Sequence, residues 1–206
     1  MNAQNVVISG NRNFFRFHFQ KIDNSFPHIK IAIREWLLSN INQASVLDVY
    51  GGNGLMFERV WKLKANTYRT VTGDALKWLS AQDDIHENLF DIDTYGLPFK
   101  ALEIIGNKAI AERIGVVCTD GALRRAGMMR LKMPKFLQEK CKWPERDLSL
   151  MAGIYHQYPR YLRYVIDCIV PQWEIERLVI RYGKGTWKQA MVYFAIVLRR
   201  KNVIHL

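Results

Sequence analysis

The sequence predicts an α/β fold in which a mostly parallel sheet ends in an antiparallel hairpin. Short apolar runs alternate with helical segments from residue 45 to residue 120, and two strand-like runs joined by a glycine-containing turn close the chain. A glycine-rich turn links the first run to a helical stretch, which is the opening unit of nucleotide-binding α/β folds. Because 49% of the 206 residues are hydrophobic and 24% are charged, we expect a single domain over residues 1–206 with a substantial core.

An N-terminal arm and a helix are expected over residues 1–44. Aromatic residues alternate with basic or polar ones over residues 13–20, which is the period of a half-buried strand or an extended arm and places Arg16 on one face. The next segment, residues 25–40, starts with Ser25, a residue type that caps helices. Its apolar side chains then follow a helical spacing, at Ile29, Ile33, Trp36 and Leu37.

Four apolar, often β-branched runs predict the strands in the middle of the chain. They begin at Ser45, Tyr68, Asn88 and Ile114, and each is followed by polar or glycine-rich residues. Helices are expected between these strands. The segments with helical character are residues 55–64, 76–82 and 101–113.

A basic helical insertion is expected over residues 121–171, before the closing hairpin. Two strand-like runs, residues 173–185 and 188–201, form that hairpin around a Gly-rich turn. Within the insertion, Arg124, Arg125, Arg160 and Arg163 offer contacts to phosphate groups beside several tyrosines. The tyrosines recur at a helical spacing of three, so at least half of the rings are expected in the core.

The charge of the chain favours a polyanionic partner. Thirty Lys and Arg against 19 Asp and Glu give a net charge of +11, which suits nucleic acid because each neutralised phosphate releases counterions. A basic surface that only maintains solubility is the alternative. The three cysteines are far apart, which argues against a disulfide framework and a close-spaced zinc site, and we expect no metal.

We expect a cytoplasmic protein without a membrane anchor. No apolar run approaches the roughly 18 residues of a membrane span, and the first residues lack the pattern of a signal peptide.

The segment from Asp48 to Gly54, DVYGGNG, is the first candidate site. Glycines let the backbone approach a ligand closely, and a carboxylate at a strand end can accept hydrogen bonds from a ribose or an amino group. The spacing differs from GxGxxG, and no GK[ST] follows. A turn that serves only the strand-to-helix geometry is the alternative interpretation.

This segment resembles motif I of the class I S-adenosylmethionine-dependent methyltransferases, with Asp48, Gly52 and Gly54 at the matching positions. The resemblance implies a Rossmann-like fold and S-adenosylmethionine as cofactor. It also implies that Asp74 and Ala75, in the GDA segment, lie near the nucleoside part of the cofactor, whereas a helix N-cap is the alternative for Asp74. The implied cofactor-binding residues are Asp48, Tyr50, Gly51, Gly52, Asn53, Gly54, Asp74 and Ala75.

The segment DIDTYGLP resembles motif IV of the amino-directed methyltransferases, in which an acid or Asn, a Pro and an aromatic residue lie beside the transferred methyl group. Asp93 and Tyr95 take the acid and aromatic positions, and Pro98 lies beside them. A carboxylate that accepts a hydrogen bond from an exocyclic amine orients it and localises its lone pair, while an aromatic ring can stack on the base. A strand-end cap and ordinary packing are the alternatives for Asp93 and Tyr95.

Residues 45–171 as a whole are similar to the tRNA guanine-N2 dimethyltransferases, without that family's C-terminal domain. Thr94 and Leu97 stand where the family has Pro and Ser, and the 19 residues between Gly54 and Asp74 are too few for one of the usual β/α units. The expected function is therefore methyl transfer to a base amino nitrogen in nucleic acid, with RNA favoured over DNA, alone or with a partner subunit or second copy. A catalytically silent binding protein with this fold and a DNA amino-methyltransferase are the alternatives.

Overall fold

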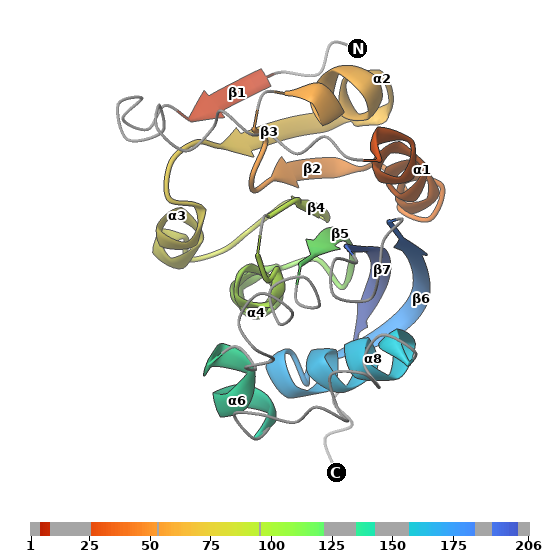
Figure 1. Cartoon of the computed structure of the whole chain (residues 1–206). Coiled ribbons are helices and arrows are strands. Elements are labelled where there is room, and N and C mark those ends of the chain that lie inside the picture. Colours follow the sequence, from red (N-terminus) through yellow and green to blue (C-terminus); the bar gives the residue numbers. More distant parts are fainter. Residues whose placement is uncertain are drawn as a thin grey trace.

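The computed structural model describes residues 26–52, 54–94, 96–121, 135–142, 157–183 and 191–201, and the backbone of residues 5–8. Within these ranges seven strands form one sheet in the order β1-β3-β2-β4-β5-β7-β6 (Figure 1). The strands are β1 (Asn5–Ile8), β2 (Ser45–Asp48), β3 (Thr67–Val71), β4 (Leu89–Ile92), β5 (Arg113–Asp120), β6 (Trp173–Tyr182) and β7 (Val192–Arg200). Neighbouring strands from β1 to β5 are parallel, and β7 runs antiparallel to both β5 and β6. The predicted Rossmann-like fold with a closing antiparallel hairpin is confirmed.

The strand order reverses between β2 and β4. From β2 the chain moves outward to β3, and it then returns to β4 and continues outward to β5 on the other side. In open α/β sheets, ligands bind beyond the carboxyl ends of the strands at such a reversal. The fold therefore directs attention to the residues that follow Asp48 and Ile92.

The outermost parallel strand comes from the start of the chain. β1 pairs with β3 in a register that runs from Asn5 opposite Tyr68 to Ile8 opposite Val71. The interval between Gly54 and Asp74 holds one strand, β3, as its length predicts, and β1 occupies the next place in the sheet. The predicted arm over residues 13–20 lies outside the described residues.

Helices cover both faces of the sheet (Figure 1). Helix α1 (Pro27–Leu38) and the π-helical turn η3 (Phe57–Trp61), which continues into α2 (Lys62–Lys64), pack on one face. Apolar side chains of the remaining helices pack on the other face. These helices are α3 (Ala75–Ala81), α4 (Phe99–Lys108), α6 (Lys135–Cys141) and α8 (Tyr158–Ile169).

Several helix boundaries differ from the sequence prediction, and two of these differences have a clear structural reason. The N-cap of α1 is Phe26, in a left-handed conformation and without a side-chain cap, so the expected Ser25 cap is wrong. Helix α4 ends at Lys108, five residues earlier than predicted. The next residue, Ala109, forms a β-bridge with Ile85, and the Ile110 amide donates a hydrogen bond to the Ile85 carbonyl, so the helix cannot continue.

The core contains two tyrosines of the predicted insertion, as expected, and two of the three cysteines. Tyr158 and Tyr161 are buried on the inner face of α8. Cys118 and Cys141 are buried thiols and Cys168 is a half-buried one. Among the described helices, none has the length and apolar character to cross a membrane.

Candidate active site

The segments that follow β2, β3 and β4 meet at Tyr50. Burial raises the pKa of the Tyr50 hydroxyl, the Asp74 carboxylate raises it further, and a hydrogen bond with the Thr94 side chain acts in the opposite direction. The Gly121 amide donates to the Gly96 carbonyl and joins the end of β5 to the same edge. Three segments singled out in the sequence are therefore neighbours at the carboxyl edge of the sheet.

The glycine turn after β2 combines tight packing with open space. A Cβ at Gly51 would collide with the Thr70 hydroxyl on β3, so any other residue would force that side chain to shift. Gly52 and Gly54 have φ angles of 53° and 78°, the left-handed region that glycine adopts readily. Apart from its chain neighbours, no heavy atom of the described residues lies within 4 Å of a Cβ built on Gly54. The turn thus serves the strand-to-helix geometry and also exposes backbone; Asn53 lies outside the described residues.

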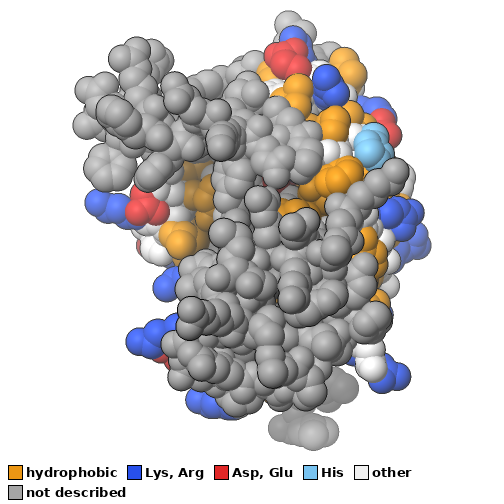
Figure 2. Space-filling model, in the orientation of Figure 1, with side chains coloured by type: hydrophobic (Ala, Val, Ile, Leu, Met, Phe, Trp, Pro, Cys, Tyr) orange, Lys and Arg blue, Asp and Glu red, His pale blue; other side chains and the backbone are white. Residues whose placement is uncertain are grey.

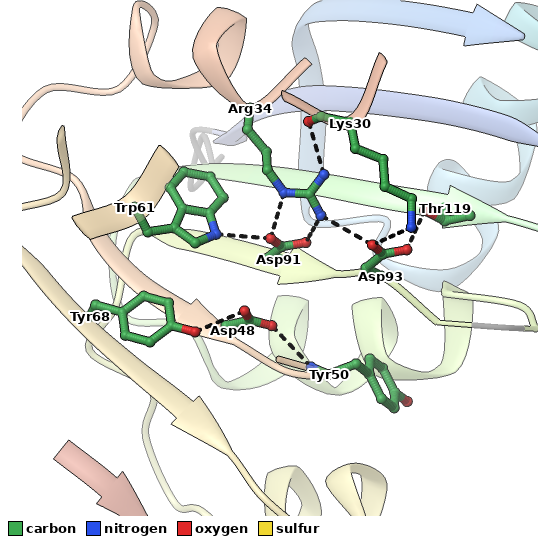
Figure 3. A network of polar contacts seen from close by, with 9 residues as sticks. All are labelled: Lys30, Arg34, Asp48, Tyr50, Trp61, Tyr68, Asp91, Asp93 and Thr119. Atoms are coloured by element: carbon green, nitrogen blue, oxygen red, sulfur yellow. Dashed lines mark hydrogen bonds and ion pairs between the residues drawn. The ribbon is translucent and has the colours of Figure 1, made fainter. Parts of the chain in front are cut away.

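Asp48 supports this turn from below. Its carboxyl is 3% exposed and accepts hydrogen bonds from the Tyr68 hydroxyl at 2.9 Å and from the Tyr50 amide at 3.2 Å (Figure 3). Burial, together with the charge of Asp91, raises the pKa of Asp48 well above its usual range. A ligand would therefore meet the turn rather than the Asp48 carboxyl itself.

Asp93 lies just beyond β4 and is held by three side chains (Figure 3). Lys30 Nζ donates to Oδ2 at 2.8 Å, Arg34 Nη2 approaches the same oxygen at 3.5 Å, and Thr119 Oγ1 donates to Oδ1 at 2.6 Å. Burial alone would raise the pKa of Asp93, but Arg34 and Lys30 outweigh it and hold that pKa below its usual value. The side chain is 21% exposed, so this ionised carboxylate remains within reach of a ligand.

Asp91 forms a buried, two-pronged ion pair with Arg34. Arg34 Nε donates to Oδ2 at 2.7 Å and Nη2 to Oδ1 at 2.6 Å, while Trp61 Nε1 adds a third hydrogen bond at 3.0 Å. Both charged side chains are 1% exposed. Charge-assisted bonds of this geometry are among the strongest in proteins, and they fasten α1 to β4 directly under the candidate site.

The sequence analysis missed the residues that surround the predicted acids. A signal was nevertheless present, because Lys30 and Arg34 share the helical stripe of Ile33 and Leu37, where charged residues are buried only in pairs. Asp91 and Asp93 are two positions apart in an extended segment, which places both on one face. The missed residues are Lys30, Arg34, Trp61, Tyr68, Asp91 and Thr119.

The remaining predicted residues are spread over several positions. Asp74 is the N-cap of α3, where Oδ1 accepts from the Lys77 amide at 3.1 Å, as the alternative interpretation proposed. Ala75 is buried at the start of α3, and Pro98 is buried at the start of α4. Arg160 and Arg163 are exposed on α8. Arg16, Asn53, Tyr95, Arg124 and Arg125 lie outside the described residues.

A hollow of about 450 Å³ lies at the opposite end of β2, near Ala44. Its charged lining is an ion pair between Lys64 and Glu35, at 2.8 Å. Because ligands of doubly wound sheets bind at the carboxyl ends of the strands, this hollow is not the candidate site. Within the described ranges, no group of three or more His, Cys, Asp or Glu side chains is arranged to hold a metal ion.

Neither a protein-family model nor a curated protein matches the sequence. Among solved structures, M. jannaschii TYW2 in complex with AdoMet is similar with a TM-score of 0.48 and 10% identity, over 88% of this chain and 80% of that chain. A SAM-dependent methyltransferase from Archaeoglobus fulgidus is similar with a TM-score of 0.46 and 11% identity, over 84% of this chain and 94% of that chain. The N-methyltransferase NodS from Bradyrhizobium japonicum is similar with a TM-score of 0.45 and 9% identity, over 87% of this chain and 99% of that chain. The strand order of the sheet, rather than these distant similarities, defines the fold.

Proposed function

We propose that this chain transfers a methyl group from S-adenosylmethionine to an amino nitrogen of a nucleic-acid base, with RNA of the tRNA type as the favoured substrate. The observation that carries the proposal is the juxtaposition of an exposed glycine turn and an ionised carboxylate at the reversal of the strand order. Ligands of open α/β sheets bind at that edge, so a cofactor on the turn and an amine on the carboxylate would lie close to each other.

The turn fits a nucleoside cofactor. The sulfonium of S-adenosylmethionine supplies an activated methyl group, so the protein has mainly to bind the cofactor and align it with the target nitrogen. The open space beside Gly54 and the left-handed backbone at Gly52 allow close approach of the chain to a ligand. Asp74 is exposed and can accept a hydrogen bond from the nucleoside while its Oδ1 caps α3.

Asp93 suits the target amine. The lone pair of an exocyclic amine is delocalised into the base, and an acceptor for one N–H helps to orient the nitrogen and to localise that pair. Because the pKa of Asp93 is below its usual value, the carboxyl stays ionised at neutral pH and acts as an acceptor. Tyr95 is proposed to stack on the base, which in a duplex would first have to flip out.

The charge distribution supports a nucleic-acid substrate. The chain carries a net charge of +11, and Lys and Arg outnumber Asp and Glu among the coloured side chains at the rim of the face in Figure 2. Arg160 lies in the first turn of α8, where the helix dipole disfavours a cation; its Nη1 donates to the Gln157 side chain at the N-cap at 2.9 Å, and the residue remains exposed. A hydrogen bond from Tyr158 to Asp120 anchors this turn to the carboxyl end of β5. Arg160 and Arg163 are thus proposed as phosphate contacts, with Arg16, Arg124 and Arg125 beside them.

Cofactor titration followed by a labelled-methyl screen tests the proposal. S-adenosylmethionine and S-adenosylhomocysteine are titrated calorimetrically into the wild type and two variants. Gly54→Val adds a β-branched side chain where the backbone is left-handed and so disrupts the turn, and Asp74→Ser keeps a capping oxygen but removes the carboxylate. Micromolar binding that Gly54→Val abolishes and Asp74→Ser weakens is expected. Transfer of label to tRNA, lost in Asp93→Ala, which removes the acceptor altogether, would then support the acceptor role.

The alternative is a catalytically silent binding protein, favoured by Thr94 at the position of the family's Pro. It predicts no cofactor binding in a cooperatively folded sample that carries no copurified cofactor, together with salt-dependent binding of nucleic acid. Transfer of label to DNA rather than tRNA would identify the DNA amino-methyltransferase.

A further inference from the structure

Lys30 is a buried lysine in a helix that does not need it for docking. It is 7% exposed and lies on the stripe that packs against the sheet. Arg34 already fastens α1 to β4 through its paired hydrogen bonds to Asp91. Apolar side chains can replace buried ion pairs with little or no loss of stability, so packing alone does not call for a charge at position 30.

The charge of Lys30 is directed at Asp93. Its Nζ lies 2.8 Å from Asp93 Oδ2, whereas Arg34 reaches the same oxygen at 3.5 Å. Arg34 makes its shorter contacts with Asp91, at 2.6 Å and 2.7 Å. Lys30 is therefore the nearer of the two cations that hold Asp93.

The contacts leave Asp93 with a defined acceptor capacity. Each carboxylate oxygen can accept about two hydrogen bonds. Oδ2 receives Lys30 and Arg34, and Oδ1 receives Thr119 at 2.6 Å. With Thr119 as its donor among the described residues, Oδ1 has capacity for about one further hydrogen bond, and the side chain is 21% exposed.

We infer that Lys30 is a positioning residue, which fixes the Asp93 carboxylate so that Oδ1 accepts one N–H of the target amino group. The inference rests on the proposed function. It makes α1, a helix that precedes the predicted motifs, part of the substrate site.

Other groups around Asp93 also influence its pKa. Arg34 adds positive charge from α1, while Thr119 donates from β5. Asp91 on β4, Asp48 on β2 and the Cys118 thiol on β5 are electrostatically coupled to Asp93, each having its own pKa raised by the Asp93 charge. Since an opposite charge at this range lowers a carboxyl pKa by about one to three units, loss of Lys30 should raise the pKa of Asp93 by about one unit.

The test compares Lys30→Met, which keeps the length of the side chain, with Lys30→Arg, which restores the charge. Lys64→Met is the matched control, because Lys64 also pairs with a carboxylate at 2.8 Å but at the exposed Glu35. The carboxyl of Asp93 is titrated by carbon-13 NMR, with its signal assigned through Asp93→Asn. Methyl transfer from labelled S-adenosylmethionine to tRNA and calorimetric titration of S-adenosylhomocysteine are measured on the same samples.

Lys30→Met should raise the pKa of Asp93 by about one unit and lower kcat about tenfold, while the affinity for S-adenosylhomocysteine stays within about twofold of wild type. Lys30→Arg should recover both properties, and Lys64→Met should change neither. An unchanged Asp93 titration or a wild-type kcat in a folded Lys30→Met protein would overturn the inference. A wild type that neither binds S-adenosylhomocysteine nor transfers label would instead overturn the proposed function and with it the substrate role of Lys30, while the NMR titration would still decide the coupling to Asp93.

Discussion

Arg34→Met is expected to destabilise the protein strongly, because it leaves the Asp91 carboxylate buried without its cation. Asp91 is 1% exposed and would retain one of its three hydrogen bonds, the one from Trp61 at 3.0 Å. Removal of one partner of a buried ion pair typically costs about 3–5 kcal/mol. For a chain of 206 residues, in which 1 kcal/mol shifts the melting temperature by about 2–4 °C, the expected loss is roughly 10 °C.

Urea unfolding followed by circular dichroism measures this loss. Arg199→Met is the control, because Arg199 is 60% exposed and pairs with Glu174 at 2.6 Å at the surface, where an ion pair contributes about 0–1 kcal/mol. The double variant Arg34→Met with Asp91→Asn removes the isolated charge and should recover about 2 kcal/mol relative to Arg34→Met. The reasoning fails if Arg34→Met is as stable as Arg199→Met, or if the double variant is no more stable than Arg34→Met.

The pH dependence of the same variant has a defined sign. Burial raises the pKa of Asp91 even with Arg34 present, and loss of the guanidinium should raise it further. A carboxyl whose pKa is higher in the folded than in the unfolded state stabilises the fold below its unfolded pKa of about 3.9, and this contribution is lost as the pH rises through the folded value. The deficit of Arg34→Met relative to wild type should therefore shrink on acidification, and a deficit that grows would contradict the explanation.

Three further predictions follow from individual contacts. Tyr158→Phe removes a buried donor to Asp120 and should cost about 1–3 kcal/mol in urea unfolding, whereas Tyr182→Phe, at a side chain that is 40% exposed, should cost less than 1 kcal/mol. Asp74→Ala should lower the free energy of unfolding by about 1 kcal/mol, because α3 loses its N-cap, whereas Asp74→Ser should retain most of the wild-type stability. Equal losses in the two variants would speak against capping. Arg160→Gln and Arg163→Gln should each reduce the slope of log affinity against log salt by about one for an RNA oligomer, and unchanged slopes would remove these residues from the interface.

The central strands could be predicted because each carries its own local signal. Strands β2, β3, β4 and β5 are apolar runs flanked by turn residues, and their pairing follows from the rules for parallel sheets. Strand β1 could not be placed, because four residues joined to β3 across more than fifty intervening positions leave no local trace of their partner. The aromatic alternation over residues 13–20 was the more conspicuous pattern in that region.

Site residues that lie within one short segment could be predicted from the sequence. Contacts between residues of distant segments could not. The glycine turn and Asp93 are each recognisable from neighbouring residues. The pairs Lys30–Asp93 and Arg34–Asp91 join positions 63 and 57 residues apart, so their existence depends on how α1 docks. The charged residues in the apolar stripe of α1 indicated that partners exist, but nothing local identified Asp91 and Asp93 as those partners.

The origin of the outermost parallel strand has a consequence for biosynthesis. Asn5 lies opposite Tyr68, so β1 leaves the ribosome well before its partner exists. At roughly 5–20 residues per second, synthesis from Asn5 to Tyr68 takes about 3 to 13 seconds, and β1 waits that long for β3. During that interval its backbone donors and acceptors are satisfied by water or by a chaperone. The outer side of β3 is therefore covered by a strand that was synthesised before β3 itself.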